Sequence, residues 1–144
     1  MILYGTDLLG RQDRVCELRD VLPTLVDIAG GEKRDFTDGE SLLDQGTGRE
    51  YLHGEHTYGD LSNHYIVTRK DKYLWVTATG REQYFDLEKD MYETHNAIND
   101  ECCKDRIAFL RRCLIESLKD RPEGFVKDGC LVSGRPVSPM IPKA

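Results

Sequence analysis

Apolar positions in the middle of the chain cluster in four short segments between residues 49 and 87. The segments are rich in Tyr, Val, Ile and Trp, and turn-forming pairs such as the Gly-Asp at 59–60 separate them. In the third segment, Tyr73, Trp75 and Thr77 would share one face of a strand, because successive strand side chains point to opposite faces. Close spacing and tight turns are typical of an antiparallel meander, so the pattern predicts a sheet of about four strands.

A helical period replaces this pattern farther along the chain. Apolar residues recur there at steps of three and four: Cys103, Ile107, Leu110, Leu114 and Leu118. The spacing predicts an amphipathic helix from about Glu101 to Lys119, whose apolar face covers one side of the sheet. A small antiparallel sheet of about four strands packed on a C-terminal helix is an α+β fold, and this is the fold class that we predict.

The chain before residue 49 reads as a strand followed by a helix. The apolar stretch at residues 1–5 predicts a short strand. Asp20 is a suitable N-cap for a helix that carries Pro23 in its first turn and ends at Gly30. The apolar stripe of this helix would consist of Leu22, Leu25, Val26 and Ala29.

Composition and charge exclude several classes of protein. The chain has 144 residues and a formal net charge of −6, whereas a nucleic-acid-binding protein would present a basic face. No apolar run approaches the roughly 20 residues of a membrane span, so we expect neither nucleic acid nor membrane as a partner. The five cysteines are odd in number and include an adjacent pair, which fits neither a disulfide framework nor a zinc site. Unpaired cysteines favour a reducing compartment, so a cytoplasmic location is favoured.

The sequence HGEH at residues 53–56 places two histidines around a glutamate. A metal held by both His53 and His56 would need a sharp bend, because side chains three apart on a strand point to opposite faces. We therefore expect no metal site there. A purely structural role also stays open. In that interpretation a strand-end histidine forms a hydrogen bond with the backbone, and Glu55 pairs with an arginine such as Arg49.

Four motifs follow one another along the chain: DVLPTLVDIAG from Asp20 to Gly30, DGESL from Asp38 to Leu42, KYLW from Lys72 to Trp75, and YFDLEKDMYETHN from Tyr84 to Asn96. In order and spacing they resemble the C-terminal part of the sulfatase family, within the alkaline-phosphatase-like superfamily. Met91 stands where that family usually has proline, a change that bears on the rigidity of a turn and not on chemistry.

The resemblance implies the C-terminal subdomain of an enzyme that hydrolyses sulfate esters to alcohol and inorganic sulfate. Family members use a formylglycine nucleophile, formed in a C/S-x-P-x-R motif, and Ca²⁺ held by the large α/β domain. None of the five cysteines here is followed by x-P-x-R. We therefore expect no catalytic residue, metal or cofactor in this chain, and no hydrolase activity of the chain alone. Its partners would be the N-terminal catalytic domain of the same polypeptide and, for the parent enzyme, a sulfated small molecule or glycan.

The resemblance also implies an organisation and a candidate site. Residues 1–48 would end the large α/β domain and include a connecting loop, 49–120 would form the α+β subdomain, and 121–144 would be a Pro- and Gly-rich extended tail. The loop after the first strand of the meander would face the active-site cleft. His56, with Glu55 beside it, is the foremost candidate for a substrate contact, because a neighbouring carboxylate favours the charged imidazole. The further candidates are His53, Tyr58 and His64.

Two other interpretations remain. Related phosphodiesterases and phosphonate monoester hydrolases carry similar C-terminal halves, so the parent enzyme would then cleave phosphate or phosphonate esters. Alternatively, the chain is a free-standing, non-catalytic α+β binding module.

Overall fold

The computed structural model describes residues 10, 12–32, 38–44, 46 and 48–137. The chain forms two compact units, residues 1–52 and residues 53–144, and each is considered by itself. The boundary falls between Leu52 and His53, whereas the sequence motifs place it between residues 48 and 49. The strand expected at residues 1–5 lies outside the described residues.

The first unit is organised around one buried carboxylate. A 3-10 turn at Leu18–Asp20 leads into helix α1, Val21–Ile28. Asp20 occupies the N-cap position, as expected, but its side chain makes no capping hydrogen bond to α1. It accepts hydrogen bonds from the backbone N–H groups of Glu17 and Glu40, at 2.8 and 2.9 Å, and forms a 2.8 Å ion pair with Arg49. Asp20 therefore ties the start of α1 to two distant loop segments.

The expected apolar stripe of α1 is largely exposed. Leu22 and Leu25 retain 52% and 55% of their accessible surface, and Leu18 and Ile28 on the same side are also exposed. Pro23 and Thr24 are the buried residues of α1. The helix thus presents an apolar face that the described part of the chain leaves uncovered.

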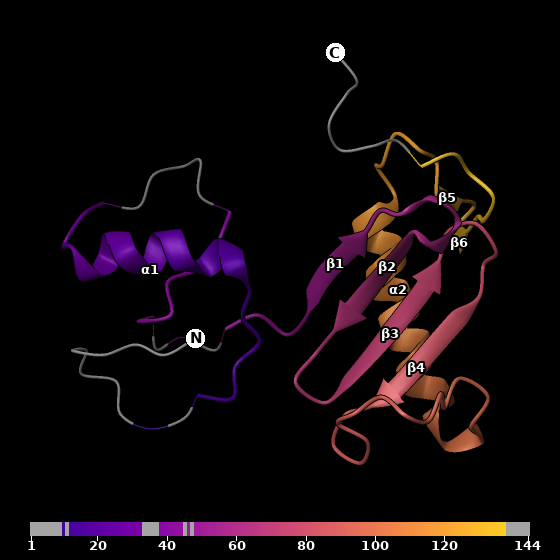
Figure 1. Cartoon of the computed structure of the whole chain (residues 1–144), viewed down its shortest axis with the longest axis horizontal. Helices are drawn as coiled ribbons and strands as arrows, with labels where there is room; N and C mark the ends of the chain where they lie inside the picture. Colours follow the sequence, from indigo (N-terminus) through magenta and orange to yellow (C-terminus); the bar gives the residue numbers. More distant parts are fainter. Residues whose placement is uncertain (1–9, 11, 33–37, 45, 47, 138–144) are drawn as a thin grey trace. The chain divides into compact units, whose positions relative to one another are not determined.

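The second unit contains the predicted antiparallel meander, which the structure confirms (Figure 1). Its strands are β1 (Leu52–His56), β2 (Asn63–Val67), β3 (Asp71–Val76) and β4 (Glu82–Asp86), in the sheet order β1-β2-β3-β4. The register pairs Ile66 with Tyr73 across β2 and β3, and Tyr73 with Tyr84 across β3 and β4. Tyr73, Trp75 and Thr77 are all buried, as their alternation predicts.

One helix covers one face of this sheet. Helix α2, Lys104–Leu118, follows a 3-10 turn at Glu101–Cys103 and lies behind the sheet in Figure 1. Its buried residues recur with the predicted period: Ile107, Leu110, Leu114 and Leu118. Arg106 also fixes the helix, because its guanidinium donates to the buried carboxylate of Asp71 on β3. Neither α1 nor α2 has the length and apolar character needed to cross a bilayer, and the same holds for every helix of the described residues.

The segment after α2 departs from the expected extended tail. It forms a two-stranded hairpin of β5 (Val126–Lys127) and β6 (Cys130–Leu131), closed by a turn in which Asp128 and Gly129 both have positive φ. Phe125 precedes β5 and is completely buried, with its ring 5.7 Å from that of Trp75 in an edge-on arrangement. One buried aromatic side chain thus anchors this hairpin to the core, and residues 121–137 belong to the folded unit.

Candidate functional site

Alternation along β1 separates the residues of the HGEH sequence into two sets. His53 and Glu55 share one face of the strand, while Gly54 and His56 share the other. The first set faces His64 on β2: His53 Nε2 lies 3.1 Å from His64 Nδ1, and Glu55 Oε2 lies 3.6 Å from the same nitrogen. The two imidazole rings are stacked with their centroids 5.3 Å apart. Three of the five predicted site residues are therefore brought together.

His64 is an uncharged histidine inside the core. Its ring stacks on Trp75 and meets the edge of Phe125, with centroid distances of 6.4 and 5.2 Å. Burial lowers the pKa of His64 to about 4, and His53 and Arg121 add to the shift. At neutral pH the His53–His64 contact is therefore a hydrogen bond in which one ring nitrogen donates and the other accepts.

Two charged residues from the segment after α2 complete this cluster. Arg121 Nη2 lies 3.1 Å from Glu55 Oε2, and the same guanidinium donates to Glu123 at 2.9 and 3.2 Å. Burial opposes the ionisation of Glu123, but hydrogen bonds from its own backbone and from Arg121 hold its pKa below the usual value. Glu55 thus pairs with an arginine, as the interpretation without a functional role expected, but that arginine is Arg121. The example Arg49 is wrong, because Arg49 binds Asp20 and Glu17 in the first unit.

His56 and Tyr58 lie apart from this cluster on an exposed surface. Their ring centroids are 6.3 Å apart, and Tyr58 retains 69% of its accessible surface. Beside Tyr58 is a hollow of about 760 Å³, whose lining residues are Thr57, Tyr58, Gly59, Asp60, Thr77, Ala78, Gly134, Arg135, Pro136 and Val137. It offers an aromatic ring, threonine hydroxyls, one carboxylate and one guanidinium, a set suited to a polar ligand with a flat face.

Sequence reasoning missed Arg121, Glu123, Phe125 and Arg135, all in the segment treated as an extended tail. A signal for part of this structure was present. Asp128 and Gly129 stand between two pairs of residues that suit strands. An Asp-Gly pair in such a position is a common sequence of a tight hairpin turn.

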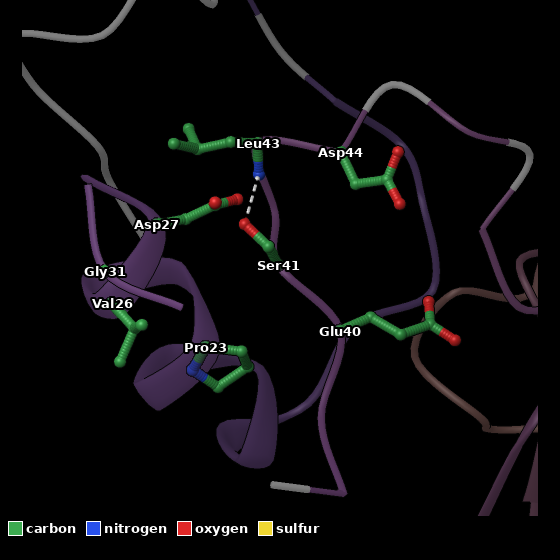
Figure 2. Close-up of a pocket in the computed structure, with 8 residues that line it drawn as sticks. All are labelled: Pro23, Val26, Asp27, Gly31, Glu40, Ser41, Leu43 and Asp44. Carbon is green, nitrogen blue, oxygen red and sulfur yellow. Dashed lines mark hydrogen bonds between the residues drawn. The ribbon is translucent and has the colours of Figure 1, made fainter. Parts of the chain in front are cut away.

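A second hollow lies in the first unit, between α1 and the loop that follows it (Figure 2). It measures about 400 Å³, and its lining residues are Pro23, Val26, Asp27, Gly31, Glu40, Ser41, Leu43 and Asp44. The backbone N–H of Leu43 donates to the Ser41 hydroxyl inside it, at 3.2 Å. Three carboxylates line this hollow, so it would repel a sulfate ester and is a poor candidate for the substrate site.

The residues present do not fit a catalytic metal or the formylglycine. Within the described ranges, no group of three or more His, Cys, Asp or Glu side chains is arranged to hold a metal ion. The facing nitrogens of His53 and His64 are engaged with each other. The sequence also lacks the C/S-x-P-x-R motif.

A comparison with curated proteins finds a clear relative in sequence. The chain is 50% identical over 133 residues to an arylsulfatase of Clostridium perfringens; the match covers 89% of this chain and 28% of the arylsulfatase. The chain thus spans less than a third of the length of this curated relative. No family model matches the sequence.

Solved structures give the same fold at lower identity. A 2-O GAG sulfatase superposes with a TM-score of 0.63 and 23% identity, covering 75% of this chain and 26% of that one. A phosphonate monoester hydrolase of Agrobacterium radiobacter superposes with a TM-score of 0.54 and 19% identity, covering 81% and 28%. At such identities the likeness concerns the fold. In sequence the chain thus matches a segment of an arylsulfatase, and its fold is that of part of a solved sulfatase.

Proposed function

We propose that this chain is the C-terminal part of a sulfatase that hydrolyses sulfate esters to alcohol and inorganic sulfate. The observation that carries the proposal is the 50% identity to an arylsulfatase over 133 residues. The nucleophile and the calcium ligands would come from the N-terminal catalytic domain of the same polypeptide, because the residues of this chain do not fit either role. The 144-residue chain alone should release no sulfate from an aryl sulfate.

Within that enzyme, His56 and Tyr58 are the residues that we expect to contact substrate. Both are exposed at the end of β1, where an imidazole N–H can donate to a sulfate or leaving-group oxygen and a tyrosine ring can lie against a sugar or aryl ring. His53, Glu55 and His64 would then act as positioning residues, because their mutual contacts hold the face of β1 opposite His56.

The experiment measures sulfate release by the full-length enzyme and by two variants. Replacing His56 by Ala should lower kcat/KM by about tenfold or more, equivalent to about 1.4 kcal/mol of transition-state binding. The matched control is His95→Ala, since His95 is also exposed and contacts Asp100 on the loop after β4. Unchanged kinetics of His56→Ala would refute only the substrate role of His56, and the proposed function would stand. A wild-type enzyme that releases no sulfate from any sulfate ester would refute the function itself.

A second reaction is supported by the fold. The likeness to the phosphonate monoester hydrolase is consistent with a parent enzyme that cleaves phosphate or phosphonate monoesters. Sulfatase chemistry is favoured, because the sequence relative at 50% identity is an arylsulfatase. Parallel assays with an aryl sulfate and the matching aryl phosphonate decide between the two. A higher kcat/KM on the phosphonate would establish the alternative.

The exposed apolar face of α1 fits the domain partnership. Leu18, Leu22, Leu25 and Ile28 would pack against the catalytic domain of the longer polypeptide, since burial of such side chains stabilises an interface by about 25 cal/mol per Å². Replacing Leu25 by Lys should then lower the melting temperature of the full-length enzyme while leaving that of the 144-residue chain unchanged. Equal effects in both proteins would contradict the assignment.

A further inference from the structure

Two neighbouring cysteines lie side by side at the start of α2, outside the candidate site. The Sγ atoms of Cys102 and Cys103 are 3.7 Å apart, and both thiols are free. Cys102 is exposed and Cys103 is partly exposed. None of the other three cysteines, Cys16, Cys113 and Cys130, has a cysteine neighbour in sequence. This pair is therefore a dithiol that solvent can reach.

We propose that Cys102 and Cys103 form a reversible oxidation site, which a hydroperoxide converts to a disulfide between adjacent residues. The Cys102 sulfur attacks an oxygen of the hydroperoxide, the O–O bond breaks, and Cys102 becomes a sulfenic acid as water or an alcohol leaves. The Cys103 sulfur then attacks the sulfenic sulfur, forming the S–S bond and releasing water. Two electrons pass from the two thiols to the peroxide, and the inference is independent of the proposed sulfatase function.

The surroundings of the pair assign the order of the two steps. Burial raises the pKa of the Cys103 thiol, and the contact with Cys102 adds to the shift. Cys103 thus holds little thiolate at neutral pH, and the thiolate is the nucleophile. A dissolved peroxide meets the exposed Cys102 first, and Cys103 is placed beside it as the resolving thiol.

The adjacency of the two residues makes the product easy to reduce. Disulfide-linked residues usually have Cα atoms about 4.4–6.8 Å apart, whereas neighbouring residues across a trans peptide are held at about 3.8 Å. The ring is therefore strained, and strained disulfides have the more oxidising potentials typical of labile, regulatory pairs. The same sulfurs should return to thiols with a mild reductant.

Closing the ring would also disturb the turn that starts α2. The backbone N–H of Cys103 donates to the carbonyl of Asp100 at 3.0 Å, within the 3-10 turn at Glu101–Cys103. The sulfurs must approach from 3.7 Å to bonding distance, which pulls on this turn. Arg106 lies in the first turn of α2 and donates to the buried Asp71. Loosening should therefore be confined to the 3-10 turn and the residues before Arg106, and it should be seen as faster amide exchange there.

The test uses the 144-residue chain and one tryptic peptide. Cleavage after Lys89 and Lys104 yields a peptide of residues 90–104 that contains Cys102 and Cys103 and no other cysteine. After treatment with hydrogen peroxide, alkylation and digestion, this peptide should be lighter than its reduced form by two hydrogen atoms and should carry no alkyl group. Dithiothreitol before alkylation should restore two alkylated cysteines.

Three variants make the result specific. Cys102→Ser and Cys103→Ser should each abolish the two-hydrogen loss, while Cys130→Ser, which removes an exposed cysteine elsewhere, should leave it unchanged. Peroxide that adds oxygen to either sulfur without closing the ring overturns the proposal. So does a disulfide that links this peptide to another, or oxidation of Cys130 at doses that leave peptide 90–104 reduced.

Discussion

Gly54, in the middle of β1, is required by the aromatic ring that lies across it. A Cβ atom at this position would lie 2.2 Å from Cζ, 2.3 Å from Oη and 2.6 Å from Cε2 of Tyr65. Carbon atoms in contact are normally about 3.5–4.0 Å apart, so Gly54→Ala forces the ring to move. The ring also has a fixed cation near it, since Lys72 Nζ lies 5.5 Å from its centroid and donates hydrogen bonds to Glu93.

The magnitude follows from two opposing terms. Forcing an extra methyl group into a packed position costs about 1–3 kcal/mol, while replacing a strand glycine by alanine gains about 0.5–1 kcal/mol where space allows. Gly54→Ala should therefore lower the free energy of unfolding by about 1–2 kcal/mol. In a Tyr65→Ala background the clash is absent, so the same substitution should stabilise the chain by about 0.5–1 kcal/mol.

Urea unfolding of the wild type, both single variants and the double variant measures this change of sign. The fluorescence of Trp75, the one tryptophan of the chain, reports on the core of the same unit. Tyr65→Phe is the control, because it keeps the ring and removes only the hydroxyl, so Gly54→Ala should remain destabilising there. An equal effect of Gly54→Ala in the wild-type and Tyr65→Ala backgrounds would refute the reasoning.

Three further predictions concern the core of the second unit. Asp71→Asn should lower the free energy of unfolding by about 2–3 kcal/mol in urea melts, because it removes the charge that pairs with Arg106, whose side chain can still reach water. Because burial lowers the pKa of His64 from 6.5 to about 4, the unfolded chain binds the extra proton first, and stability should fall as the pH falls from 6.5 to 4. His64→Gln should remove that part of the pH dependence, on the order of 3 kcal/mol, and an unchanged difference between pH 7 and pH 4 would contradict it. Phe125→Ala should cost about 3–5 kcal/mol and speed tryptic cleavage after Lys127, whereas an intact β5–β6 hairpin in that variant would show that the hairpin is held in another way.

The sheet and helix α2 could be predicted because burial repeats along them. Tyr73 and Trp75 of β3, and each turn of α2 that faces the sheet, contribute apolar residues at a fixed period. The β5–β6 hairpin offers no such repetition, since Phe125 is the one buried residue of the described positions 121–137. A segment with one buried apolar residue and several glycines and prolines has the composition of an extended tail. Its Asp-Gly pair was the one sequence signal that indicated a turn.

Asp20 shows a second limit of prediction from sequence, because local and distant donors compete for the same carboxylate. Its position before α1 predicts a capping side chain, and the helix does begin where expected. Arg49 and the N–H of Glu40, both far along the chain, engage the carboxylate instead. A buried carboxylate gains more from a guanidinium and two amide donors than from one capping bond, so the distant partners win.

The candidate site illustrates what a strand period determines and what it leaves open. Alternation alone dictates that His53 and Glu55 share one face of β1 and that His56 takes the other. It does not dictate which face is buried, because both faces carry a histidine. Arg121 and Phe125 determine which face is buried, because Phe125 packs against His64 and Arg121 pairs with Glu55. Glu55 is therefore directed away from His56, so an anion bound at His56 would be held by a hydrogen bond from the imidazole and not by an ion pair that Glu55 supports.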